Sequence, residues 1–353
     1  MNIENKKVFV AMSGGVDSSV AAYLLINEGC DVTGVYMKNW SDPLADECPW
    51  REDIKDFRKV CKILKIPARI EVFEEEYRKK VVKYLVDGYK KGITPNPDML
   101  CNSEIKFKLF LDKAKELGAD LIATGHYVIK KEIKGIHNLY QAKDGNKDQS
   151  YFLALLNQKQ LSMSLFPIGI YPKNEIRKIA KKAKLPVHDK KDSQGICFIG
   201  KVKFSDFIRD FVPRNEGDII TDKGEIIGRH DGVSYYTIGQ RHGLKIGGGV
   251  PYFVIKKNKK TNELVVAKGS SNVNLFNKEL IANKFNWISN ERIKLPLNCY
   301  ARIRYRQPLQ RCRVTKKNGI YSITFTKPQR AITPGQFIVL YSRRKMLGGG
   351  VIN

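Results

Sequence analysis

The sequence predicts a Rossmann-like α/β domain with a parallel sheet, followed by two smaller β regions. Three observations predict this class. Strand-like and amphipathic helix-like segments alternate over about the first 125 residues, short alternating segments broken by Gly and Asn follow from about Gly217, and residues 276–353 form a separate basic stretch. A chain of 353 residues is also longer than one hydrophobic core usually supports. We therefore expect three domains, at residues 1–205, 206–275 and 276–353.

The alternation in the first domain can be followed element by element. Hydrophobic spacing predicts strands at Lys7–Ala11, Asp31–Lys38, Ile70–Phe73 and Asp120–Gly125, and helices at Ser18–Asn27, Arg51–Leu64, Glu75–Lys91 and Ser103–Leu117. Strands interleaved with helices indicate βαβ units, whose parallel sheet is covered on both faces. Beyond them we expect a hairpin at Tyr127–Asp144 and helices near Gln149–Asn157 and Lys173–Lys184.

Charge is the strongest signal in the composition. The chain has 63 Lys and Arg against 36 Asp and Glu, a formal charge of +27, and residues 276–353 alone carry a net +14. This predicts a polyanionic partner, with nucleic acid ahead of a membrane surface, although a general Lys-rich bias would explain part of the charge. The sequence has no apolar run of membrane-spanning length and no apolar leader at its start, so we expect a cytoplasmic protein without membrane contact.

A glycine turn between a strand and a helix predicts a phosphate site. In the sequence VFVAMSGGVDSS, Gly14 and Gly15 allow close approach of the backbone to an anion, and Ser18 and Ser19 supply hydroxyl groups at a helix N-terminus. The loop matches neither the Walker A nor the G-x-G-x-x-G pattern, and the alternative is an ordinary helix-capping turn. Because Asp17 is negative, we expect it to act on phosphates through a magnesium ion.

Two of the seven cysteines occupy polar surroundings. Cys101 follows the Pro-rich segment TPNPDML and is predicted to lie in a loop just before a helix N-terminus, where the helix dipole favours a thiolate. Cys197 lies in the Gly-containing segment DSQGICFIG, also predicted as a loop. The alternative for either is a buried cysteine that packs as a small apolar residue, which is the interpretation we favour for Cys61. Cys48 has no assigned role.

The other cysteines give a structural expectation and an exclusion. Cys299 and Cys312 alternate with arginines in β segments and are predicted to face inward. No C-x-x-C pair occurs, which argues against a zinc ribbon or an iron–sulfur cluster. An odd cysteine number in a chain without a secretion signal also argues against a disulfide scaffold.

In the segment YARIRYR every second residue from Arg302 is an arginine, which predicts a strand with arginines on one face. Arg302, Arg304 and Arg306 would share one side with Tyr300, and Arg311 and Arg313 repeat the pattern on the next strand. Planar guanidinium groups suit phosphate recognition and base stacking. The alternative is a solvated edge strand whose charges prevent aggregation.

The chain resembles the family of bacterial tRNA-specific 2-thiouridylases in a series of motifs that run in family order: NPDMLCNSEIKF, LIATGHY, DGNKDQSYFL, DSQGICFIG, YYTIGQRHGL, RIRYRQ, AITPGQ and LGGG. The SGGVDSS loop resembles the ATP pyrophosphatase loop of the adenine-nucleotide α-hydrolase-like superfamily. The resemblance implies an ATP pyrophosphatase domain, a central β domain and a C-terminal β-barrel. It also implies ATP-dependent adenylation of the 2-carbonyl oxygen of the wobble uridine in the tRNAs for Lys, Glu and Gln. Sulfur transfer from a persulfide then gives 2-thiouridine, AMP and pyrophosphate.

The resemblance also implies roles for individual residues. Cys197 would carry the persulfide, Cys101 would be the nucleophile that ends in a transient Cys101–Cys197 disulfide, and Asp98 would be an acid or base, although an ordinary acidic loop residue is the alternative. The target base would lie near Asn96, Pro97 and Asp98. ATP would be bound by Ala11, Met12, Ser13, Gly14, Gly15, Val16, Asp17, Ser18, Met37 and Gly125, and tRNA by His126, Lys147, Asp148, Gln149, Arg304, Tyr305 and Gln336.

The position of two of these residues is also expected from the predicted fold. Gly125 and His126 follow the Leu121–Thr124 strand, and ligands bind at the carboxyl ends of parallel strands. Met37 ends the second strand in the same way, although core packing would also explain a Met there.

The expected co-substrate is ATP with Mg²⁺, without an iron–sulfur cluster. The expected partners are the tRNA anticodon stem-loop and a sulfur donor such as a cysteine desulfurase or a sulfur-relay protein. Two alternatives remain at this level. One is another ATP pyrophosphatase-loop ligase, such as a tRNA lysidine synthetase, which would need no cysteine pair. The other is a non-enzymatic RNA-binding protein with a vestigial nucleotide site, which would not exchange pyrophosphate into ATP.

Overall fold

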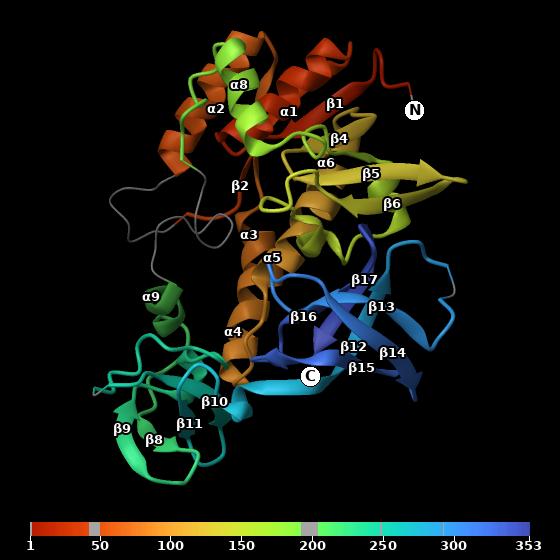
Figure 1. Ribbon diagram of the computed structural model, residues 1–353. Coiled ribbons are helices and arrows are strands. Elements are labelled where there is room, and N and C mark those ends of the chain that lie inside the picture. Colours follow the sequence, from red (N-terminus) through yellow and green to blue (C-terminus); the bar gives the residue numbers. More distant parts are fainter. Residues whose placement is uncertain (1, 42–49, 192–203, 248, 292) are drawn as a thin grey trace.

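A parallel sheet forms the centre of the N-terminal region in the computed structural model, which describes residues 2–41, 50–191, 204–247, 249–291 and 293–353. The order of its described strands is β3-β2-β1-β4-β7, and every neighbouring pair is parallel. The bounds are β1 (Lys7–Ala11), β2 (Asp31–Lys38), β3 (Ala68–Val72), β4 (Leu121–Thr124) and β7 (Ser164–Leu165). The predicted βαβ arrangement is confirmed (Figure 1).

Helices cover both faces of this sheet, as its apolar strands require. Val8 and Val10 of β1 belong to one buried cluster with residues of α1 (Val16–Asn27), α2 (Trp50–Leu64) and α8 (Lys173–Lys182). Phe9 and Ala11 point to the other face and belong to a second cluster, which includes residues of two long helices. The period-two alternation of β1 therefore assigns its side chains to two separate cores.

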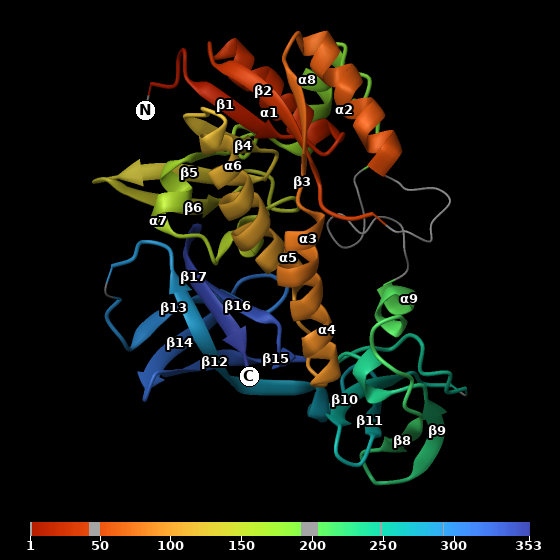
Figure 2. The same ribbon diagram turned by 180° about the vertical axis from the view of Figure 1, so that it is seen from behind.

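Each of the two long helices contains a π-helical segment. The first consists of α3 (Glu74–Tyr77), π-helix η1 (Arg78–Val82) and α4 (Lys83–Lys90). The second consists of α5 (Pro97–Leu100), π-helix η2 (Cys101–Leu109) and α6 (Phe110–Glu116). In both views α4 runs down from the sheet to the central β domain, with the barrel on its other side (Figure 1, Figure 2).

The region after β4 departs from one expectation. The hairpin is confirmed as β5 (Val128–Ile133) and β6 (Ile136–Gln141). The helix predicted near residues 149–157 is wrong, since only the 3-10 turn η3 (Ser150–Leu153) forms there and α7 begins later, at Gln158–Ser162. The reason is that Asn157 is an N-cap: its side chain accepts a hydrogen bond from the Gln160 N–H in a reciprocal capping box, which starts a helix at that point.

The central domain is a small sheet with its own core. Its strands are β8 (Gly217–Thr221), β9 (Ile226–His230), β10 (Tyr252–Asn258) and β11 (Glu263–Lys268), in the order β10-β11-β8-β9. The short helices α9 (Phe204–Arg209), η4 (Val233–Tyr235) and η5 (Val273–Leu275) flank it. The aliphatic side chains of Ile219, Val254, Leu264 and Val266 form the centre of its core.

The C-terminal region is a closed barrel. Its strands are β12 (Phe276–Trp287), β13 (Leu297–Arg302), β14 (Gln310–Lys317), β15 (Ile320–Arg330), β16 (Phe337–Ser342) and β17 (Lys345–Ile352). They follow the order β12-β15-β14-β13-β16-β17, and pairing of β12 with β17 closes the ring. The predicted sequence of an α/β domain, a small β domain and a β-barrel is therefore confirmed.

The barrel is also joined to the N-terminal region through its sheet. β17 pairs with β6 of the hairpin, with Met346 opposite Leu139 and Lys345 opposite Tyr140. The sheet thus continues from the barrel into the hairpin that follows β4. Within the described ranges, no helix combines the length and the apolarity that crossing a bilayer would require.

Candidate active site

The loop between β1 and α1 is organised by its own backbone and hydroxyl groups. Gly14 has a positive φ of 73°, and a Cβ there would lie 2.4 Å from the carbonyl oxygen of Asp53, so only glycine fits. The Ser18 hydroxyl accepts a hydrogen bond from the Ser13 N–H at 3.3 Å and lies 3.3 Å from the Gly15 carbonyl oxygen, to which it donates. Gly15 is the N-cap of α1 and has no side chain to cap it, which leaves the first N–H groups of the helix available to an anion.

The end of β4 lies directly against this loop. A Cβ on Gly125 would approach the Ser18 nitrogen to 2.7 Å and the Asp17 carbonyl carbon to 2.9 Å. Gly125, Asp17 and Ser18 therefore meet at the carboxyl end of the parallel sheet, where open α/β sheets bind ligands. Met37, at the corresponding end of β2, is buried in the same cluster as Ala11.

Asp17 has two partners that the sequence did not suggest. Lys173, the first residue of α8, places its Nζ 2.7 and 2.8 Å from the two carboxylate oxygens, and the Tyr127 hydroxyl donates to one of them at 2.6 Å. The Lys173 side chain is 11% exposed and that of Asp17 is 30% exposed. The phosphate loop therefore carries a carboxylate whose charge is balanced by a nearly buried ammonium group.

A second lysine ties the loop to α2. The Lys190 Nζ donates to the Gly14 carbonyl oxygen at 3.1 Å, to Asp53 at 2.9 Å and to Asp56 at 2.7 Å. Although burial opposes it, hydrogen bonds with the two carboxylates raise the pKa of Lys190 above its ordinary value. Lys190 thus remains charged at neutral pH and fixes the glycine turn from outside.

Asn39 is a further polar group at this end of the sheet. It follows β2 directly, is 1% exposed, and neither its Nδ2 nor its Oδ1 has a hydrogen-bond partner among the residues that the structure describes. An unsatisfied buried amide is costly, and its adjacent donor and acceptor match the edge of a nucleobase.

The prediction that Cys101 lies in a loop ahead of a helix is wrong. The helix begins at Pro97, with Asn96 in extended conformation as its N-cap, so Cys101 lies inside the helix and is only 1% exposed. Proline is well accepted at the first helical position, since its missing N–H would be unpaired there. Cys101 starts the π-helical segment η2 and belongs to the same buried cluster as Ala11 and Met37. π-Helical turns often occur at functional sites.

The other cysteines differ in where they lie in the structure. Cys197 and Cys48 lie outside the described residues, so the Cys101–Cys197 pairing stays a prediction. Cys61 is buried as predicted, and burial raises its pKa to about 12. Cys299 and Cys312 face inward as predicted, on neighbouring strands of the barrel.

The barrel contacts the segment that leads to Cys101. Gln336 donates from Nε2 to the Thr94 carbonyl oxygen at 2.8 Å, and its Oε1 lies 3.5 Å from the Asn96 Nδ2. The Thr94 N–H donates to the Pro334 carbonyl oxygen at 3.0 Å. The structure therefore brings together Gln336 and Asn96, which are 240 positions apart in the sequence.

The predicted arginine face does not form. β13 ends at Arg302, whose side chain turns inward, and Arg306 is exposed with a positive φ of 64°. Arg304 is half-buried, and its Nη2 donates to the Ile238 and Ala331 carbonyl oxygens at 2.9 and 3.1 Å. Arg311 and Arg313 on β14 do point outward.

Arg302 instead forms a buried ion pair with Asp148. The Nη1 to Oδ2 distance is 3.0 Å, and the two side chains are 8% and 0% exposed. Asp148 also accepts hydrogen bonds from the Gln141 side chain and from the N–H groups of Ala142 and Ser150, at 3.1 to 3.2 Å. The Asp148 side chain therefore holds its loop against the barrel from below the surface, and its expected contact with tRNA stays a prediction.

The other predicted tRNA residues are differently placed. Lys147 and Gln149 flank Asp148 and are half-buried, and the Gln149 Oε1 accepts a hydrogen bond from the Tyr127 N–H at 3.0 Å. Tyr305 is half-buried against Phe152, with ring centroids 4.5 Å apart.

His126 is largely buried beside the sheet. Its Nδ1 is 2.8 Å from the Thr124 hydroxyl. Burial, with a smaller effect of Lys106, lowers the pKa of His126 well below its ordinary value, so the imidazole is neutral at neutral pH.

Comparison with known proteins finds similarity along the whole chain. Residues 6–201 match the family model described as tRNA methyl transferase HUP domain, residues 205–268 the tRNA methyl transferase PRC-barrel domain, and residues 277–352 the aminomethyltransferase beta-barrel domain. The tRNA-specific 2-thiouridylase MnmA of Hahella chejuensis is 49% identical over 99% of this chain and 97% of that protein.

Two further matches extend this picture. A protein of the same name from Halalkalibacterium halodurans is 49% identical over 99% of this chain and 95% of that protein. Among solved structures, the U34-tRNA thiolase NcsA of Methanococcus maripaludis is similar with a TM-score of 0.37 and 18% identity, over 59% of this chain and 65% of that one.

Proposed function

Because this chain belongs to the tRNA-specific 2-thiouridylase family and is a tRNA sulfurtransferase, we propose that it uses ATP to replace the 2-oxygen of the wobble uridine by sulfur in the tRNAs for Lys, Glu and Gln. The products are 2-thiouridine, AMP and pyrophosphate. One observation carries the assignment of its active site: Ala11 of the phosphate loop strand, Met37 and Cys101 belong to one buried cluster on the same face of the sheet. This supports a site in which nucleotide chemistry and thiol chemistry take place on the same side of the sheet.

The nucleotide loop binds and activates ATP. The open N–H groups at the start of α1 hold the phosphates, and the glycines Gly14, Gly15 and Gly125 let them approach the backbone. Met37, at the end of β2, contacts the adenine. The uridine 2-oxygen attacks the α-phosphorus, and pyrophosphate leaves.

A magnesium ion fits the Asp17 carboxylate. The position already attracts a cation, since the Lys173 ammonium contacts both oxygens, and Mg²⁺ is commonly held by one carboxylate together with substrate phosphates. When bound, the ion would neutralise charge that develops on the departing pyrophosphate. Lys173, which contacts the same carboxylate, would donate to the phosphates beside it.

Sulfur transfer uses Cys197 and Cys101. The terminal sulfur of a Cys197 persulfide attacks C2 of the activated uracil, and AMP leaves with the former 2-oxygen. The Cys101 thiolate then attacks the Cys197 sulfur, which releases the thiocarbonyl and forms a Cys101–Cys197 disulfide. A reductant restores both thiols. Asp98, one turn before Cys101, exchanges the proton that Cys101 must lose.

Recognition of tRNA spans the catalytic domain and the barrel. We assign direct contacts to His126, Lys147, Gln149, Arg304, Tyr305 and Gln336, and the target base to the segment Asn96–Asp98. The target base must leave the anticodon stack to reach a cysteine buried in a helix. Gln336 links the two parts, since it contacts Asn96 from the barrel.

The sulfur must come from outside these steps, because none of them generates a persulfide. We assign this role to a cysteine desulfurase or a sulfur-relay protein, acting in the cytoplasm where tRNA is modified.

A single-turnover assay with ³⁵S-labelled persulfide tests the two cysteine roles. Cys197→Ser should still release pyrophosphate from ATP and tRNA but should carry no labelled sulfur. Cys101→Ser should accept labelled sulfur on Cys197 and stall before 2-thiouridine is released. The matched control is Cys61→Ala, because Cys61 is as buried as Cys101, at 1% exposure, but lies on α2.

Two outcomes would contradict the proposal. Thiolation of tRNA by Cys197→Ser would show that another residue carries the sulfur. Full thiolation by Cys101→Ser in the absence of reductant would exclude the disulfide step. Thiolation by Cys61→Ala, measured per folded molecule, should equal that of the wild type, which separates the loss of sulfur chemistry from the loss of a buried thiol as such.

A further inference from the structure

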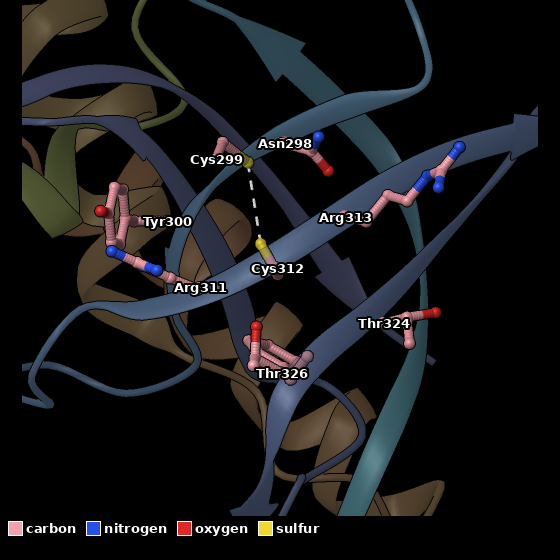
Figure 3. A pocket seen from close by; sticks show the side chains of 9 residues that line it. Asn298, Cys299, Tyr300, Arg311, Cys312, Arg313, Thr324 and Thr326 are labelled. Carbon is pink, nitrogen blue, oxygen red and sulfur yellow. Dashed lines mark hydrogen bonds between the residues drawn. The ribbon is translucent and has the colours of Figure 1, made fainter.

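A pair of cysteines outside the proposed active site lies in the barrel. Cys299 of β13 and Cys312 of β14 are directly opposite in the antiparallel register, and their Sγ atoms are 3.7 Å apart (Figure 3). They are 7% and 6% exposed and belong to the barrel core, whereas Cys101 belongs to a different cluster. Cross-strand neighbours have Cα separations of roughly 4.5–5.5 Å, within the range that a disulfide bridges.

A pocket of about 530 Å³ on the barrel wall borders the pair. Cys299, Cys312 and Phe325 contribute to its lining, together with polar residues of the outer strand faces: Asn298, Tyr300, Arg311, Arg313, Thr324 and Thr326. Figure 3 shows the two arginines on either side of Cys312 along β14. Two arginines among the residues that line a pocket favour a small anionic ligand.

We propose that Cys299 and Cys312 are a second thiol pair, which a small anionic disulfide entering this pocket oxidises to a cross-strand disulfide. In the first step one cysteine thiolate attacks the disulfide, forms a mixed disulfide and displaces one small thiolate, which takes up the proton that the cysteine gave up. In the second step the other cysteine attacks the protein sulfur of the mixed disulfide and releases the second small thiol. Two protein thiols are oxidised and one small disulfide is reduced to two thiols.

The position of the bond gives it a structural effect. Residues 303–309 connect β13 to β14, and a Cys299–Cys312 bond would cross-link the two strands just before this connection. The connection includes Arg304 and Tyr305. Oxidation would therefore restrict the movement of the two ends of the segment to which we assign tRNA contacts. This consequence rests on the proposed function, whereas the thiol chemistry does not.

Mass spectrometry of the full-length protein tests the proposal. The reduced protein is incubated with glutathione disulfide, remaining thiols are alkylated, and digested peptides are searched for a Cys299–Cys312 link. We expect this link in the wild type and in Cys101→Ser and Cys61→Ala, because neither residue takes part. In Cys312→Ser we expect a glutathione adduct that persists on Cys299. The proposal would be overturned if both thiols can still be alkylated after the incubation. It would also be overturned if each cysteine carries a glutathione adduct and no Cys299–Cys312 link forms.

The charge preference is tested with a cationic reagent, cystamine. Relative to a free-cysteine peptide, the pair should react faster with glutathione disulfide than with cystamine, and the double variant Arg311→Gln/Arg313→Gln should lose this preference. Both arginines are exposed, so the barrel is expected to fold without them. Equal relative rates in the wild type would overturn the assignment of an anionic ligand.

Discussion

Replacing Arg302 by Met should destabilise the protein strongly, because it leaves a carboxylate buried without its counter-ion. The Arg302 and Asp148 side chains are 8% and 0% exposed. Removing one partner of such a pair costs about 3–5 kcal/mol. Asp148 keeps three N–H donors, from Gln141, Ala142 and Ser150, so the lower end of this range applies. The guanidinium also lies 5.2 Å from the centroid of the buried Tyr341 ring, a contact worth about 2 kcal/mol in such desolvated surroundings.

A double-mutant cycle separates the ion pair from packing. Asp148→Asn alone leaves a buried guanidinium whose Nε already has no hydrogen-bond partner in the described part of the chain, and should cost a similar amount. Arg302→Met/Asp148→Asn removes both charges, so its cost should be less than the sum of the single costs by about 2 kcal/mol.

Urea unfolding followed by the fluorescence of Trp287 measures this cycle. Trp287 lies in β12 and donates to the Tyr321 hydroxyl at 3.2 Å, so it reports on the barrel once Trp40 and Trp50 are replaced by Phe. Arg313→Met is the matched control on the neighbouring strand, and should leave the free energy of unfolding nearly unchanged. If the two single costs add to within about 0.5 kcal/mol, the reasoning is refuted.

Three further predictions concern the nucleotide end of the sheet. Gly125→Ala should reduce ATP–pyrophosphate exchange at least tenfold, because the new Cβ would lie 2.7 Å from the Ser18 nitrogen, whereas Gly145→Ala, which has open space around it, should leave exchange intact. Lys173→Met should slow pyrophosphate release by about 10²–10³-fold while tRNA affinity is retained, and an unchanged rate would restrict Lys173 to a structural role. The pKa of His126 is lowered in the folded protein, so as pH falls this imidazole takes up a proton in the unfolded chain at a higher pH than in the folded protein. The stability of the fold should therefore decrease as pH falls below about 6.5. His126→Gln should flatten that dependence in denaturation curves between roughly pH 5 and 6.5, and a curve as steep as wild type would contradict the assignment.

Local sequence patterns predicted the elements whose partners are nearby. The interleaving of strands and helices predicted a sheet covered on both faces, as β1 shows, and Cys61, Cys299 and Cys312 lie inward as their spacing suggested. In each case the signal is a period of two or 3.6 residues, which reports on burial along one element.

Several of the failures share one physical cause, which is contact with distant parts of the chain. The alternation of arginine with other residues in YARIRYR predicted a strand that continues through Arg306. The structure instead pairs Arg302 with Asp148, which lies 154 positions away and holds the Arg302 side chain in the interior. Lys173 and Lys190 gave no signal at all, since their partners Asp17 and Gly14 lie 156 and 176 positions earlier. For Cys101 the error was local, because prolines were interpreted as loop residues although one of them starts the helix.

The continuation of the barrel sheet into the β5–β6 hairpin makes the central domain a topological insertion. The chain leaves the catalytic region after α8, forms the sheet β8–β11, and returns at β12 to a barrel whose β17 is hydrogen-bonded to β6. The two regions on either side of the insertion therefore share one sheet. Changes in length within the loops of the inserted domain can be absorbed without moving that sheet, whereas a change in the register of β17 would be transmitted to the strands on both its sides and to the catalytic hairpin.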